Sequence, residues 1–246
     1  MNKIFARLAS GRRIASASDD AAGLAMAAQL DATITTMSQA SRNAGDLSSA
    51  LNIADGALGQ IQDIAGRLQE LAMTSANGVY TSDQRSALQA EYSSLTQEIQ
   101  RIGATTSYNG QKLLDGSTIS AQLGQGSSLS LGGIDVQSLA NSLSSQDLNT
   151  AAGALSALDA ISNFSDQIIE QRGGSIGSAL SRLDSIQQGL TDQRVAQSEA
   201  LSAISDVDIA TASLDAGRNK VLQRYQVALL ATSSQLQSSV INALLA

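Results

Sequence analysis

A long series of apolar residues, spaced alternately three and four apart, constrains this chain more than any other feature. The series extends from Met37 to Ala72 and meets no polar residue. Its eleven positions are Met37, Ala40, Ala44, Leu47, Leu51, Ala54, Leu58, Ile61, Ala65, Leu68 and Ala72. Such a heptad pattern predicts a long helix whose apolar seam packs against a partner helix. Because five of the eleven residues are Ala, we expect that partner to approach closely.

The signals around the seam predict a first helix over 24–77 and a second over 82–103. Asn77-Gly78 is a good helix stop, because both residue types tolerate the left-handed conformation. Thr81, Ser82 and Asp83 then offer N-cap candidates for the second helix. The chain contains no Pro, which is compatible with long uninterrupted helices.

The middle of the chain has a different character. Over 107–146, Gly-containing turns separate short segments with alternating apolar residues, which predicts a small β-hairpin region. Helical periodicity returns over 150–198, where Gly173-Gly174 marks a bend or a place of close packing.

A cap-like cluster around 205–208 introduces the last amphipathic segment, within 201–246. Its apolar stripe consists of Leu222, Tyr225, Leu229, Leu236, Val240 and Leu244. We therefore predict a mainly α fold, a long antiparallel coiled-coil-like helical bundle with the small β-hairpin region at mid-chain.

Composition narrows the possible functions. The chain has no His and no Cys, so the usual proton shuttle, thiolate nucleophile and metal ligands are missing, and we expect no enzyme and no cofactor. The net charge of −7 and the lack of a basic run longer than Arg12-Arg13 argue against nucleic-acid binding. No apolar stretch approaches the length of a membrane span, so we expect no membrane insertion.

Two local patterns invite a binding hypothesis and have simpler explanations. Asp19, Asp20, Asp206 and Asp208 could serve acid chemistry or Ca²⁺, but nothing supplies further ligands at loop spacing. Helix capping or elbow contacts explain them better. Residues 124–126 resemble a phosphate cradle only superficially, because no Lys follows, and hairpin turns account for them.

Several segments, in order, resemble bacterial flagellins. Residues 10–25 (SGRRIASASDDAAGLA) resemble the segment near the start of that family. Further similar segments are Arg67–Ala72, Ser75–Asn77, Gln89–Glu91, Glu98–Ile99, Tyr108–Gly110, Gln171–Arg172, Gly177, Arg182–Leu183, Ser205–Ala210 and Val240–Leu245. The resemblance covers nearly the whole chain except about 114–146, and its strength lies in the number of motifs in the right order.

The resemblance implies a domain organisation. Residues 1–23 would be the remnant of an amino-terminal inner segment with its linker, 24–200 the rod-like core, and 201–246 the carboxy-terminal inner helix. Flagellins carry further residues before the segment that begins here near Leu8, so we expect the chain to be truncated at its amino terminus. The inner helix would then lack its usual partner, and the chain would stay monomeric or form small oligomers.

The function implied by the resemblance is that of a structural subunit of the flagellar filament. It would be exported by type III secretion, polymerise outside the cell and serve motility. The implied partners are other flagellin subunits, an export chaperone, the type III export apparatus, and hook-associated and cap proteins. The alternative is a flagellin-like hook–filament junction protein or surface adhesin. A catalytic flagellin with a metalloprotease insert needs two His residues, and the chain has none.

The resemblance also suggests an innate-receptor patch. In flagellins an Arg and a Leu of the first core helix and a Glu of the second are sensed by a Toll-like receptor, and the matching residues are Arg67, Leu71 and Glu91. The alternative is that Arg67 and Glu91 are solvated or packed at subunit contacts. Because the residues around Arg67 differ from those of strongly sensed flagellins, we expect weak recognition.

Overall fold

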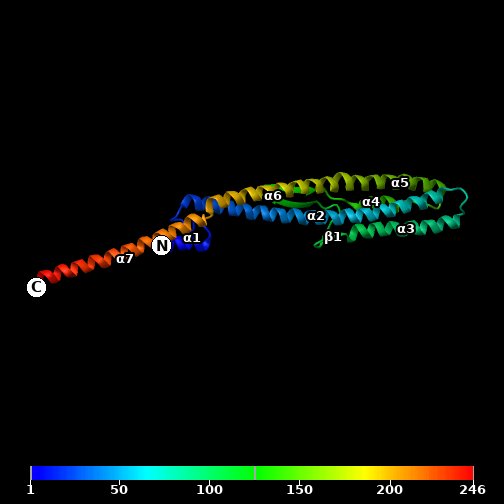
Figure 1. Ribbon diagram of the computed structural model, residues 1–246. Coiled ribbons are helices and arrows are strands. Elements are labelled where there is room, and N and C mark those ends of the chain that lie inside the picture. The colour runs from blue at the N-terminus through cyan, green and yellow to red at the C-terminus, as the bar shows by residue number, and fades with distance from the viewer. Residues whose placement is uncertain (1, 125, 246) are drawn as a thin grey trace. The chain divides into compact units, whose positions relative to one another are not determined.

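Helices make up most of the computed structural model, which describes residues 2–124 and 126–245, without the side chains of Asn2 and 238–245 (Figure 1). The helices are α1 (Asn2–Ser10), α2 (Ala21–Ala76), α3 (Ser82–Thr105), α4 (Val136–Ser144), α5 (Ala151–Glu170), the π-helix η1 (Gln171–Gly177), α6 (Ser178–Ser205) and α7 (Ile209–Leu245). The strands are β1 (Ser107–Tyr108), β2 (Gln111–Lys112), β3 (Ile119–Gly124) and β4 (Ser127–Leu131). The predicted mainly α fold is confirmed.

The chain forms two compact units. One contains the residues up to Thr35 together with those from Gln193 onward, and the other runs from Thr36 to Asp192. The second unit holds the continuous hydrophobic core, to which α2, α3, α4, α5, η1, α6 and the strands contribute.

The apolar seam of α2 supplies one wall of that core. Ten of its eleven positions are buried, and Met37 at its start is half-buried. Leu51, Leu58, Ile61 and Leu68 are all 0% exposed. Fully burying a side chain of this size contributes about 1.5–3 kcal/mol, so the seam is a large part of what holds the unit together. Arg172 in η1 reaches Asp55 of α2, which places the returning helix beside the seam (Figure 1).

Helix α3 begins where the sequence predicts, because a capping box fixes its first turn. The Thr81 hydroxyl accepts a hydrogen bond from the Gln84 amide at 3.4 Å, and the Gln84 side chain accepts one from the Thr81 amide at 2.9 Å. The helix continues to Thr105, two residues beyond the predicted end.

The predicted β region 107–146 is correct only in its first part. Two antiparallel hairpins, β1–β2 and β3–β4, end at Leu131. The prediction is wrong for the remainder, where α4 forms. Asp135 caps this helix by accepting a hydrogen bond from the Ser138 amide at 2.9 Å. Its buried residues Val136, Ala140 and Leu143 have the spacing of a helix face. Gln125, between β3 and β4, lies outside the described residues.

The helix predicted over 150–198 is interrupted and is longer than expected. Its centre is the π-helix η1, at the Gly pair that the sequence marks as irregular. Beyond η1, α6 continues to Ser205, because residues 190–205 contain neither Gly nor Pro to end it. The break before the last helix therefore lies at 206–208, whereas the domain boundary at 200/201 stays a prediction.

The first 23 residues are also more structured than a linker. Helix α1 is followed by a loop, 11–20, and α2 begins at Ala21 instead of residue 24. Asp20 caps α2, since its carboxylate accepts a hydrogen bond from the Gly23 amide at 2.9 Å. Ile14 is buried over this first turn, and a side-chain carbon at Gly23 would lie 2.6 Å from its terminal methyl carbon.

Candidate assembly surface

The loop 11–20 is fixed to the break between α6 and α7 by backbone and side-chain hydrogen bonds. The Arg13 amide donates to the Ser205 carbonyl at 2.6 Å, and the Arg13 guanidinium donates to the Ile204 carbonyl at 2.7 Å. The Val207 amide donates to the Gly11 carbonyl at 3.0 Å. The start of α7 is therefore held by residues that are about 190 positions away along the chain.

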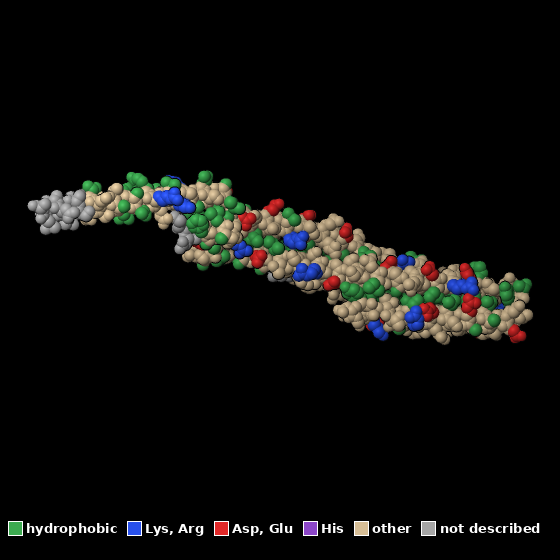
Figure 2. Space-filling model, turned by 60° about the horizontal axis from the view of Figure 1, so that its bottom comes forward, with side chains coloured by type: hydrophobic (Ala, Val, Ile, Leu, Met, Phe, Trp, Pro, Cys, Tyr) green, Lys and Arg blue, Asp and Glu red, His purple; other side chains and the backbone are tan. Residues whose placement is uncertain are grey.

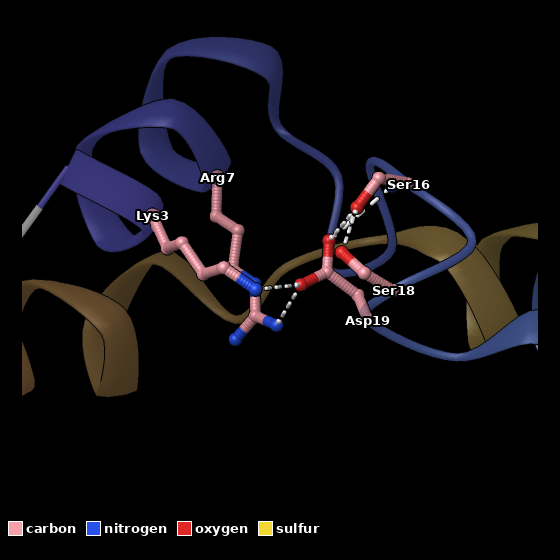
Figure 3. Close-up of polar contacts among 5 residues, drawn as sticks. All are labelled: Lys3, Arg7, Ser16, Ser18 and Asp19. Carbon is pink, nitrogen blue, oxygen red and sulfur yellow. Dashed lines mark hydrogen bonds and ion pairs between the residues drawn. The ribbon is translucent and has the colours of Figure 1, made fainter.

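Asp19 is the centre of a polar cluster on this loop (Figure 3). Its Oδ1 atom lies 3.2 Å from Lys3 Nζ and 3.3 Å from Arg7 Nη2, both in α1. Its Oδ2 atom accepts hydrogen bonds from the amide and hydroxyl groups of Ser16, at 3.2 and 3.0 Å. The Asp19 side chain is 9% exposed, against 35% for Arg7 and 72% for Lys3. The Ser16 and Lys3 hydrogen bonds lower the pKa of Asp19 from 3.8 to about 2.

Asp208 provides the cap of α7. Its Oδ1 atom accepts hydrogen bonds from the amides of Ala210 and Thr211 at 2.9 and 3.3 Å, and its Oδ2 atom accepts one from the Thr211 hydroxyl at 2.7 Å. The Thr211 hydrogen bonds, followed by that of Ala210, lower the pKa of this carboxyl group.

Helix α7 exposes apolar side chains between Ile209 and Leu236 (Figure 2). They are Ile209, Leu214, Val221, Leu222, Tyr225, Val227, Leu229, Leu230 and Leu236, each between 47% and 75% exposed. Adjacent positions such as 221 and 222, or 229 and 230, point to different sides of a helix, so the apolar surface is wider than the predicted single stripe. Val240 and Leu244 of that stripe have side chains outside the described part. A helix that is apolar on several sides is typical of a buried environment.

The predicted receptor residues do not form one exposed patch. Arg67 and Glu91 do meet, with Nη2 and Oε1 2.8 Å apart, at half-exposed positions on α2 and α3. Arg67 also pairs with Glu70 at 2.7 Å, and the Glu70 and Glu91 contacts raise its pKa. Leu71, however, is 2% exposed and belongs to the core.

Protein groups contact each of the four Asp residues considered as a possible metal or acid site. Asp19 pairs with Lys3 and Arg7, Asp20 and Asp208 cap helices, and Asp206 accepts hydrogen bonds from Ser202 and Ser205. Within the described residues, no group of three or more acidic, His or Cys side chains could hold a metal ion. None of the helices in the described part is long and apolar enough to cross a membrane.

The contact between η1 and α2 was not predicted from the sequence. The Arg172 guanidinium binds Asp55 at 2.9 and 3.3 Å and Gln62 at 2.7 Å. The Asp55 contact is the first cause of the raised pKa of Arg172. A seven-residue step from Asp55 to Gln62 places both on one face of α2, but nothing in the sequence says which distant cation lies opposite.

Comparisons with known proteins extend over most of the chain. A family model of the bacterial flagellin N-terminal helical region matches residues 1–119, and one of the bacterial flagellin C-terminal helical region matches residues 158–244. A flagellin of Halalkalibacterium halodurans is 35% identical over 248 aligned residues, which cover 98% of this chain and 91% of the relative.

Solved structures agree with this similarity. A crystal structure of Bacillus cereus flagellin is similar with a TM-score of 0.56 and 32% identity, over 61% of this chain and 88% of that chain. A structure described as a flagellar hook-associated protein from Vibrio parahaemolyticus has a TM-score of 0.65 at 15% identity, over 76% of this chain and 100% of that chain. At that identity the second match concerns the fold alone.

Proposed function

The chain belongs to the bacterial flagellin family, and from this membership we propose that it acts as a structural subunit of the flagellar filament. Its activity is self-association, in which copies of the chain pack side by side and end to end into a polymer. Repetition of one heterologous contact builds an open helical assembly of this kind. The filament lies outside the cell and serves motility.

The observation that carries the proposal is the apolar surface of α7. Nine large apolar side chains on this helix are at least 47% exposed in the single chain. Contiguous exposed apolar surface of this extent marks a site of protein association. Its distribution over several sides of α7 favours contacts with more than one neighbouring copy, as a polymer provides and a simple dimer does not.

The second unit fits the role of a rigid spacer. Its core follows the α2 seam from Ala44 to Ala72, and the Ala residues in that seam allow close helix packing without bulky side chains. Flagellins are a structural family, and the chain has no His or Cys with which to add the usual catalytic chemistry.

Further partners follow from family membership as proposals. We infer export by the type III apparatus with the help of a chaperone, and contacts with hook-associated and cap proteins at the filament ends. The exposed apolar surface of α7 is a suitable chaperone surface before assembly, because it is the part of the single chain most exposed to unwanted association. Pull-down of α7 variants with an export chaperone tests this step.

We propose that Toll-like receptor recognition is weak. The burial of Leu71 and the pairing of Arg67 with both Glu70 and Glu91 support this, since the side chains that would contact a receptor are already engaged. A receptor reporter assay should give a low response. A response as strong as that to potent flagellins would contradict the proposal.

The alternative, a junction protein or adhesin, is not favoured by the comparisons, because the similarity at 30% identity or more is to flagellins. The structural match to a hook-associated protein concerns the fold alone. Stoichiometry separates the two roles, because a filament subunit is the dominant protein of purified filaments and a junction protein a minor one.

The direct test is polymerisation, followed by pelleting and negative-stain electron microscopy. Two preparations are compared, the chain itself and the same chain carrying a flagellin amino-terminal segment ahead of Met1. Regular filaments in at least one preparation are the expected result, and a difference between the two would measure what the added segment contributes. If both preparations stay monomeric at high concentration, the chain is not a filament subunit.

A further inference from the structure

Two cationic side chains of α1 contact one carboxylate of the loop 11–20. Of the apolar side chains of α1, Phe5 is 52% exposed, while Ile4 and Leu8 are half-buried. Its ionic contacts are better defined, since Lys3 and Arg7 converge on the single carboxylate of Asp19 (Figure 3). These two ion pairs connect α1 to the loop 11–20.

The docked position of α1 also carries a cost. Arg7 donates from Nη2 to Asp19, but its Nε atom is buried and has no hydrogen-bond partner among the described residues. A buried unsatisfied donor is destabilising, and undocking α1 would return this atom to water. Docking thus combines a favourable contact at Nη2 with an unfavourable environment at Nε of the same guanidinium group.

The two oxygens of Asp19 have separate tasks. Oδ2 accepts the Ser16 amide and hydroxyl and so closes the local turn, while Oδ1 faces Lys3 and Arg7 and so holds α1. An Asn side chain at position 19 could keep the first task through its carbonyl oxygen. Its NH₂ group would then face the two cations and could not accept from them.

We propose that Asp19 is an ionic latch that keeps α1 docked against the start of α7, and that neutralising or screening this carboxylate releases α1 while the rest of the chain stays folded. Beside the latch lies a cavity of about 250 Å³ between α1 and α7, and release opens it. Its lining includes Ile4, Arg7, Arg13, Asp208, Thr211 and Asp215. Release would therefore expose both the inner face of α1 and the first turns of α7.

Acid and salt are the expected triggers. The pKa of Asp19 is about 2 in the docked state, against 3.8 ordinarily, so its contribution is complete above pH ~4 and is lost as the pH falls towards ~2. The charged groups that contact it are Lys3 and Arg7 on α1, and the cavity next to Arg7 adds Arg13 on the loop and Asp208 and Asp215 on α7. Salt should weaken the exposed Lys3 pair before the more buried Arg7 pair.

The test is hydrogen–deuterium exchange of the whole chain, read by mass spectrometry in peptides of α1. Asp19→Asn should raise the exchange rate of α1 by about tenfold or more, while peptides of α3 and α5 keep their wild-type protection. The matched control is Asp31→Asn, which removes the same charge from an exposed position in the same unit. It should leave α1 unchanged.

Further variants separate the latch from a general folding defect. Lys3→Met and Arg7→Met each remove one cation and should each raise α1 exchange by less than Asp19→Asn. Ser16→Ala removes a donor to Oδ2 only and should have a smaller effect still. After correction for intrinsic exchange, α1 of the wild type should open between pH ~4 and ~2 more than α1 of Asp19→Asn.

Wild-type protection of α1 in Asp19→Asn would overturn the proposal, as would equal opening in Asp31→Asn. If Asp19→Asn loses amide protection in every helix, the substitution has unfolded the chain, and the Lys3→Met and Arg7→Met variants become the test. Wild-type protection of α1 in both of these variants would contradict the latch. The latch works within one chain, so none of these outcomes depends on filament assembly.

Discussion

At the residue scale, Gly133 lies where the backbone of Gly116 leaves no room for a side chain. A side-chain carbon at position 133 would lie 1.8 Å from the Gly116 carbonyl oxygen, whereas one at Gly132 would meet nothing within 4 Å. Beside this contact, the Gly116 amide donates to the Ile134 carbonyl at 3.1 Å. The backbones of Asp115 and Asp135 form an isolated antiparallel β-bridge there. Two neighbouring glycines thus have very different roles.

We predict that Gly133→Ala lowers the free energy of unfolding by about 2 kcal/mol or more, because the backbone must move apart and the hydrogen bond is strained. Gly132→Ala is the matched control and should change the free energy by less than about 0.5 kcal/mol. Urea unfolding followed by circular dichroism measures both. Equal effects of the two substitutions would show that the close approach is unimportant.

Tyr92 gives a pH prediction at the same scale. It is 1% exposed, its hydroxyl donates to the Leu143 carbonyl at 3.2 Å, and burial raises its pKa from 10.0 to about 12. The folded chain keeps this proton above pH ~10 while the unfolded chain releases it. The contribution to stability is therefore complete below pH ~10 and falls by roughly 1.4 kcal/mol per unit towards pH ~12.

Urea unfolding at pH ~9 and ~11 tests this prediction against Tyr92→Phe. At pH ~9 the free energy of unfolding of the variant should be about 1 kcal/mol lower than that of the wild type, because a hydrogen bond is missing. Between pH ~9 and ~11 it should fall less than that of the wild type. Parallel declines would assign the alkaline loss to other groups.

At the element scale, the Ala residues of the α2 seam predict close packing. Ala54 is 1% exposed and lies in the seam between Leu51 and Leu58. We predict that Ala54→Leu lowers the free energy of unfolding by about 1–3 kcal/mol, since the added atoms have no space. Asn52→Leu, at an exposed position two residues away, should have little effect. If Ala54→Leu has the wild-type free energy of unfolding in chemical denaturation, the partner helix does not pack closely against Ala54.

The same helix explains how much the sequence predicts. Heptad spacing is a local signal repeated many times, so the extent of α2 and the inward side of its seam follow from it. The capping box at Thr81 and Gln84 similarly locates the start of α3. Short segments carry less information. The segment Ile134-Asp135-Val136 is equally compatible with a short strand and with the start of α4. Only the joint burial of Val136, Ala140 and Leu143 identifies it as the start of a helix.

The candidate site was less predictable, because its contacts join distant residues. The lack of further ligands at loop spacing predicts that Asp19 makes elbow contacts and does not bind a metal. The sequence does not predict that its partners are Lys3 and Arg7. The pairing of Arg172 with Asp55 depends on the register of η1 against α2, which a π-helix shifts relative to a regular helix. The family resemblance places Leu71 in a receptor patch, whereas packing in the hydrophobic core buries its side chain.

At the scale of the whole molecule, the two units differ in what stabilises them. The second unit has its own continuous core, whereas α7 has few described contacts beyond α1 and the loop at its start. Helix stability in proteins comes mostly from packing of an apolar face. We therefore predict fast amide exchange in α7 of the single chain and slow exchange in α3 and α5, with α7 becoming protected on polymerisation. Equal protection of α7 in both states would contradict burial in the polymer.

The last prediction connects α7 to assembly directly. Leu229 is 51% exposed in the single chain, so placing a charge there costs little in the monomer. In a polymer that buries this helix, an unpaired carboxylate at the same position would be strongly unfavourable. In whichever of the two preparations forms filaments, Leu229→Asp should therefore abolish pelleting of polymer, while the circular dichroism spectrum and the urea midpoint of the monomer stay unchanged. Asn163→Asp, which adds the same charge at an exposed position of α5, is the control and should polymerise like the wild type. Filaments formed by Leu229→Asp would show that the exposed apolar side of α7 at this residue is not an assembly surface.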